Sequence, residues 1–113
     1  MKIVKKDEVL IHENSKTCIA TEYPSADKDI NVALVKINGR YPEVGYALNE
    51  VCKELAFINE GEGKIVLDNG NEIILEKGDS ILIEPGEEYY WQGSLILIVS
   101  CTPAWYPEQH KKV

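Results

Sequence analysis

The residues of this chain that could do chemistry gather in two segments framed by glycine. The first segment spans residues 54–63 and the second spans residues 78–89. A carboxylate such as Glu54, which opens the first segment, can act as a general base, and a phenol such as Tyr89, which closes the second, can donate a proton. The chain has only two histidines, which both lie outside these segments: His12 and His110.

The composition is that of an ordinary acidic globular protein. The chain has 113 residues, 44% of them hydrophobic, and a net charge of −7, which suits a single domain over residues 1–113 with one modest core. Twelve basic residues against nineteen acidic ones cannot easily form the clustered basic face of a nucleic-acid binder. Anionic membrane surfaces are disfavoured for the same reason.

No targeting or spanning segment is expected. No apolar run approaches the roughly 20 residues of a transmembrane helix, and no long apolar segment follows the first lysines, so we expect a cytoplasmic protein. The three cysteines form no closely spaced pair. We expect Cys18 and Cys101 to be buried in strands as reduced thiols, and Cys52 to lie near the site.

Short strand patterns between turn residues predict an all-β fold with little or no helix. Strands are expected at 9–12, 17–23, 30–37, 53–58, 64–67, 72–76, 80–84, 89–92 and 95–101. Turns are expected at 38–39, 59–63, 68–71, 77–79 and 85–86, and Asn69–Gly70 is the strongest hairpin signal among them. This succession is typical of a sandwich or closed barrel.

Two features suggest a second subunit. The segment Leu95–Val99 is apolar at every position, which predicts a strand covered on both faces. The tail around Trp105 and Tyr106 carries large aromatic side chains, which near a terminus usually dock onto something. We expect a homodimer, in which the first strands and the tail take part in packing or dimerisation. The alternative is that the tail packs on its own barrel.

The glycine spacing resembles the two-part signature of the cupins, over a motif region of about residues 39–93. Glu54 followed after six residues by Gly61 matches the end of the first motif, and Gly78–Asp79 opens the second. In the second motif Gly86 is retained, while Pro85 is displaced by one position. The resemblance implies a single jelly-roll β-barrel of the small conserved-barrel type.

The motif histidines are replaced in this chain. In the first motif their positions fall on Ala47 and Asn49 or, with a shorter spacer, on Leu48 and Glu50. In the second motif the histidine position is Tyr89. The resemblance implies a metal held by three imidazoles and a carboxylate, but the oxygen donors here suit a transition metal poorly. We expect no tight metal site and no cofactor, and leave open a weak divalent metal.

The same motif positions outline a pocket for a small ligand. If Tyr89 points inward, strand alternation also turns Trp91 inward, and Tyr46 or Asn49 would sit near the same opening. Aromatic walls with a few polar groups are typical of small-ligand sites. The alternative is that Tyr89 and Trp91 fill the barrel.

Arg40, the only arginine, precedes the first motif and could bind a carboxylate or phosphate. The alternative is a solvated loop cation or an ion pair between subunits.

The sequence leaves three functions open. We expect a protein that binds a small polar metabolite, a sugar or sugar derivative, through Arg40, Tyr46, Asn49, Glu50, Glu54, Tyr89 and Trp91. The second is a sugar isomerase or epimerase in which Glu54 and Tyr89 are catalytic, because burial moves a carboxyl pKa toward neutrality, or an enzyme with an oxygen-ligated metal. The third is a dimer with a filled barrel.

Overall fold

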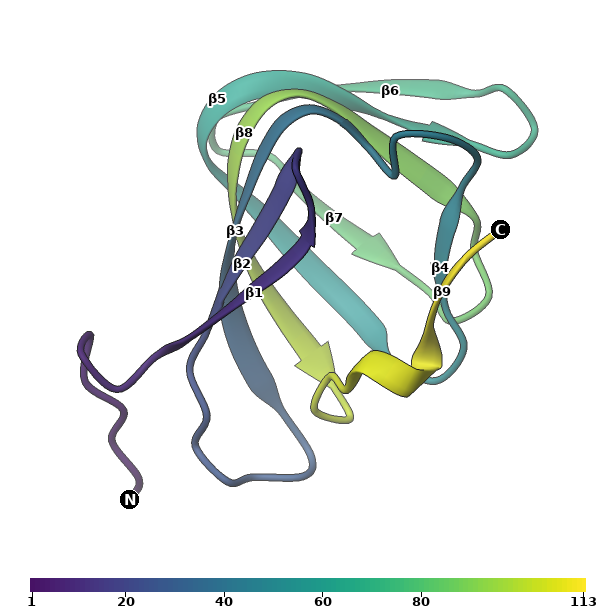
Figure 1. Ribbon diagram of the computed structural model, residues 1–113. Helices are drawn as coiled ribbons and strands as arrows, with labels where there is room; N and C mark the ends of the chain where they lie inside the picture. The colour runs from purple at the N-terminus through teal and green to yellow at the C-terminus, as the bar shows by residue number, and fades with distance from the viewer.

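The computed structural model describes residues 1–113, and its regular secondary structure is almost entirely strand (Figure 1). The expected all-β fold is confirmed, with one short 3-10 helix, η1 (Pro107–Gln109). The strands are β1 (Leu10–Ser15), β2 (Cys18–Glu22), β3 (Asn31–Tyr41), β4 (Ala47–Asn49), β5 (Lys53–Leu67), β6 (Glu72–Glu76), β7 (Ser80–Ile83), β8 (Tyr89–Thr102) and β9 (His110–Lys112). No helix is long and apolar enough to cross a membrane.

The strands form one curled antiparallel sheet around a single core. Its order is β1-β2-β3-β8-β4-β9, and β5 pairs with β8, β6 and β7. Strand β8 is the centre of the sheet, because it pairs with β5 along one edge and with both β3 and β4 on the other. The inward residues of these strands fill the barrel, among them Ile37, Ile58, Ile65, Leu95 and Leu97.

Three glycines bend the long strands where the sequence predicted turns. Strands β3, β5 and β8 each run through one of these places. The predictions of turns at 38–39 and 59–63 and of a break between 92 and 95 were therefore wrong. Gly93 of β8 lies opposite Gly39 of β3 and Gly63 of β5. A Cβ atom on Gly93 would come 2.6 Å from the Gly63 Cα, so the strands can bend sharply together only without side chains there.

The turns that separate the other strands were predicted correctly. The hairpin between β5 and β6 turns at Gly70 (φ 89°), and the next two turns contain Gly78 and Gly86, both with positive φ. These backbone conformations are open to glycine at little cost.

Strand β8 alternates within the single chain, so the second cover expected over residues 95–99 is not supplied by this chain itself. Leu95, Leu97 and Val99 are buried, whereas Ile98 is 36% exposed on the outer face. An apolar run therefore does not by itself mean two covered faces within one chain.

The tail packs on its own barrel, which was the alternative to docking on a partner. The ring of Trp105 lies 5.6 Å from that of His12 and 5.8 Å from that of His110. The sequence did not predict the last two strands of the sheet order, β4 and β9, which pair with each other through His110, Lys111 and Lys112. In Figure 1 the yellow tail lies across one end of the barrel.

Candidate functional site

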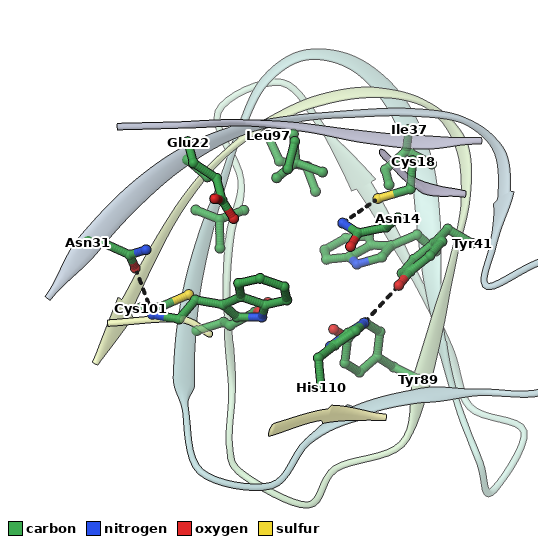
Figure 2. A pocket seen from close by; sticks show the side chains of 17 residues that line it. Asn14, Cys18, Glu22, Asn31, Ile37, Tyr41, Tyr89, Leu97, Cys101 and His110 are labelled. Carbon is green, nitrogen blue, oxygen red and sulfur yellow. Dashed lines mark hydrogen bonds between the residues drawn. The ribbon is translucent and has the colours of Figure 1, made fainter. Parts of the chain in front are cut away.

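A cavity of about 60 Å³ lies inside the barrel, at the end that the tail covers. Its wall combines apolar strand residues with four aromatic side chains and a small set of polar ones (Figure 2). The aromatic residues are Tyr41, Tyr89, Trp91 and Trp105. The polar ones are Asn14, Glu22, Asn31, Glu54 and His110. A cavity of this volume has room for a few water molecules, so it takes a small ligand or one part of a larger one.

Glu54 is the most deeply buried acidic group of this wall. It is 8% exposed, and its Oε1 atom accepts a hydrogen bond of 2.8 Å from the Asn49 Nδ2 atom. Burial raises the pKa of the Glu54 carboxyl, and hydrogen bonds from Asn49 and Cys101 only partly oppose this. A carboxyl group in such a position can hold or take up a proton nearer to neutral pH.

Asn49 connects Glu54 to the tail. Its Oδ1 atom accepts hydrogen bonds from Gln109 Nε2 and from His110 Nδ1, both at 2.9 Å. Gln109 in turn accepts the backbone N–H groups of Val51 and Cys52. No buried polar side-chain atom lacks a partner, so the network holds Glu54 in a fixed place.

The hydrogen bonds of His110 settle its protonation. Because the Asn49 Oδ1 atom can only accept, Nδ1 of His110 carries the proton. Nε2 then accepts the bond of 2.7 Å from the Tyr41 hydroxyl, the contact drawn in Figure 2. Burial lowers the pKa of His110 to about 4, and the ring is therefore neutral at neutral pH.

The two phenols of the cavity stay protonated. Burial, and then the charge of Glu54, raises the pKa of Tyr89 well above its usual value. Burial likewise raises the pKa of Tyr41. Both are hydroxyl groups at any ordinary pH, and Tyr89 lies edge-on to Trp91 with ring centres 6.1 Å apart.

Four of the seven predicted site residues come together. Glu54, Tyr89 and Trp91 line the cavity, and Asn49 supports Glu54 from behind. Ala47 and Asn49 are both buried, whereas Glu50 is exposed. The longer spacer, which assigns the two histidine positions of the first motif to Ala47 and Asn49, therefore matches the residues that face inward.

The other three predicted residues lie outside the cavity wall. Arg40 donates to the backbone oxygens of Pro42 and Gly45 and lies 3.7 Å above the Tyr90 ring. The Tyr46 ring lies 5.8 Å from the Tyr90 ring. Glu50 forms a surface ion pair of 3.7 Å with Lys111. These three residues therefore contact other parts of the protein and do not line the cavity.

Several cavity residues were not predicted as site residues. Cys18 and Cys101 line the wall, whereas Cys52, the cysteine expected near the site, is buried outside it. Glu22 shares the inner face of β2 with Cys18, so strand alternation could have identified it. Nothing in the local pattern indicated that the tail brings Trp105 and His110 to the cavity.

The donors around Glu54 do not fit a divalent metal. Nowhere in the chain do three His, Cys, Asp or Glu side chains gather closely enough to hold a metal ion. Both ring nitrogens of His110 are occupied by hydrogen bonds, as is the oxygen of Asn49. Protonated phenols are poor ligands, which leaves two carboxylates on the cavity wall, Glu54 and Glu22, too few for a metal site with this set of donors.

Comparison with known proteins identifies the family and the fold. Residues 34–94 match the family model described as Cupin domain. No curated protein sequence matches the chain.

Solved structures with little sequence identity share the whole fold. A structure of Streptomyces Pac13 with uridine is 18% identical, with a TM-score of 0.86 over 100% of this chain and 90% of Pac13; Pac13 is described as a unique nucleoside dehydratase. Ectoine synthase from P. lautus is 15% identical, with a TM-score of 0.75 over 100% of this chain and 90% of the synthase. KdgF from Halomonas sp. is 15% identical, with a TM-score of 0.70 over 91% and 94% of the two chains.

Proposed function

We propose that this chain, which belongs to the cupin domain family, binds a small polar metabolite, a sugar or sugar derivative, in its cavity without a tightly held metal. The observation that carries the proposal is the position of Glu54, a carboxylate fixed by Asn49 at the wall of a cavity with aromatic sides. A carboxylate bonds sugar hydroxyls, and aromatic rings pack on the apolar faces of a sugar ring.

The size of the cavity defines how such a ligand would bind. At about 60 Å³ it is small beside typical ligand pockets of roughly 300–1,000 Å³. A sugar ring would enter with one edge toward Glu54, and the rest of the ligand would extend past the half-buried Trp105. The solved structure with uridine, a nucleoside that contains a ribose ring, supports this class of ligand.

A second candidate function is proton transfer on the bound sugar, as in an isomerase or epimerase. The raised pKa of Glu54 favours it, because a carboxyl group that titrates nearer neutrality is an effective general base. Tyr89, protonated on the same wall, would be the proton donor. In this mechanism Glu54 removes a proton from carbon while Tyr89 donates one to the oxygen that becomes negative. The Tyr89 oxygen then takes back a hydroxyl proton from the sugar as Glu54 returns its proton to the neighbouring carbon, so both groups end in their starting states.

We also propose that the chain forms a homodimer through the outer face of its sheet. Leu55, Phe57 and Ile98 are 50%, 43% and 36% exposed and lie side by side, with Phe57 opposite Ile98. Leu82 of β7, 49% exposed, extends the row beside Leu55. Light scattering should give twice the chain mass, and Phe57→Lys should give the mass of one chain; a monomeric unmodified chain contradicts the dimer.

Thermal unfolding with candidate ligands tests the binding function. Uridine, ribose and glucose at millimolar concentrations should include at least one compound that raises the melting temperature, because a ligand of the folded state stabilises it. Glu54→Gln keeps the shape of the side chain and the hydrogen bond from Asn49, and it should reduce the affinity for that ligand at least tenfold. Glu50→Gln removes a carboxylate from the surface and is the matched control.

The outcomes separate the candidates. No shift with any compound contradicts sugar binding. Equal losses in Glu54→Gln and Glu50→Gln contradict the assignment of the site. If the bound compound exchanges a carbon-bound hydrogen with deuterated water in the unmodified protein but not in Glu54→Gln, proton transfer is the function; unchanged exchange in the variant contradicts it.

A further inference from the structure

We infer that the cavity accepts ligands whose inserted part is uncharged or cationic and rejects phosphates and carboxylates, and that Glu22 sets this preference. The inference rests on the proposed function, since it concerns the charge of the metabolite that the cavity binds. It assigns a ligand-binding role to a residue outside both motif segments.

Glu22 is a second carboxylate on the cavity wall. Strand β2 turns Cys18, Ala20 and Glu22 toward the cavity, as alternation requires, and in Figure 2 the Glu22 side chain points into the open space. The carboxylate takes part in none of the three ion pairs of the molecule. Its oxygens are therefore available to a ligand.

No lysine or arginine of the protein lies on the cavity wall beside the two carboxylates. None of the 17 residues of the wall is lysine or arginine. The nearest cation is the Lys112 ammonium, whose charge acts on Cys18 and His110. It is engaged elsewhere, since it donates to the backbone oxygen of Asn14 at 2.7 Å and lies 5.4 Å from the centre of the Tyr41 ring. Arg40 is held by backbone oxygens of its own loop. The one histidine of the wall, His110, is neutral, since its Nε2 atom accepts from Tyr41.

The Cys101 thiol reports the combined effect of Glu54 and Glu22. Burial raises its pKa most, and the negative charges of Glu54, then of Cys52 and then of Glu22 raise it further. Both carboxylates therefore act on one point of the wall, which disfavours negative charge there. An anionic group placed in the same space would meet the same repulsion, with little water to screen it.

The aromatic walls favour positive charge for a second reason. The faces of tryptophan and tyrosine rings attract cations, and Trp91, Trp105 and Tyr41 all line the cavity. A primary amine could donate to Glu22 while it lies against these rings. A hydroxyl group could also donate to Glu22, but its interaction with the carboxylate and the rings would be weaker because it carries no charge.

Three compounds that share one scaffold and carry different charges at the 5′ position test the preference. Uridine, 5′-amino-5′-deoxyuridine and uridine 5′-monophosphate present a neutral, a cationic and an anionic group on one scaffold. By calorimetric titration we expect the amine to bind at least as tightly as uridine and the phosphate at least tenfold more weakly. A phosphate that binds as well as uridine overturns the inference and leaves the proposed function standing.

Glu22→Gln assigns the effect to one side chain. The variant should reduce the ratio of the affinities for the amine and the phosphate at least threefold, while the affinity for uridine itself changes little. Glu13→Gln removes an exposed carboxylate from the neighbouring strand β1 and should leave the difference as it is. An equal effect of both variants would mean that only net charge matters, which overturns the role of Glu22.

Charged thiol reagents decide the point even if no nucleoside binds, in which case only the proposed function fails. Cys101 and Cys18 line the cavity, so their labelling by aminoethyl and sulfonatoethyl methanethiosulfonate can be compared by mass spectrometry. Normalised to the urea-unfolded chain, the cationic reagent should label Cys101 at least tenfold faster, and Glu22→Gln should reduce this ratio. Equal labelling by the two reagents, complete or absent, contradicts the inference.

Discussion

The region that matches the family and the two segments outside it contribute different things to the molecule. Residues 34–94 contain the glycine bends and the fixed Glu54, together with Tyr89 and Trp91. The segments on either side bring Glu22 and His110 to the same cavity. The part that specifies the barrel is thus the part with a family pattern, and much of what a ligand would touch comes from parts without one.

The largest effect is expected inside the family region, at the glycine row. Gly93→Ala places a Cβ atom 2.6 Å from backbone atoms of Glu62 and Gly63, at a φ of 138°. Strained backbone and overpacking together should cost about 3–5 kcal/mol of the free energy of unfolding, as measured by urea denaturation. Gly78→Ala, at a φ of 95° with no atom nearby, should cost only about 1–2 kcal/mol. Equal losses would show that the row has no special packing role.

An intermediate effect is expected in the tail, and it depends on pH. Because the folded state holds the pKa of His110 at about 4, below its ordinary 6.5, this residue stabilises the fold above pH 6.5. That contribution is lost as the pH falls toward 4, and it amounts to about 3 kcal/mol. The raised pKa of Glu54 acts in the opposite direction, since it favours the folded state at low pH.

His110→Gln isolates the histidine, because Glu54 is present in both proteins. The free energy of unfolding of the unmodified chain, minus that of the variant, should shrink by about 3 kcal/mol between pH 7 and pH 4. Urea denaturation at several pH values measures it. Parallel pH profiles for the two proteins would contradict the neutral, buried imidazole.

The smallest effect is expected at Arg40, a residue of the family region that the sequence suggested as a ligand contact. Arg40→Lys loses the paired bonds to Pro42 and Gly45 and the stacking on Tyr90. This should cost about 1 kcal/mol of stability without changing affinity for a sugar or nucleoside. A tenfold loss of affinity would return Arg40 to the site and weaken the division between the two regions.

The sequence predicted the fold well and the cavity only in part, for physical reasons. Turn residues act locally, so Gly70, Gly78 and Gly86 indicated their turns correctly. Gly93 was misread because its role depends on glycines of two other strands, which only the sheet brings beside it. His110 gave no signal for the same reason, since its neighbour Asn49 is 61 residues away.

The amide of Asn49 has a consequence for the movement of protons. It joins Glu54 to His110 and Tyr41 by hydrogen bonds, but an amide does not titrate and passes no proton along the chain. The carboxyl of Glu54 is therefore linked to the tail by hydrogen bonds but exchanges no proton with it. A proton that Glu54 took from a bound molecule would stay in the cavity, and its natural destination would be another atom of that same molecule.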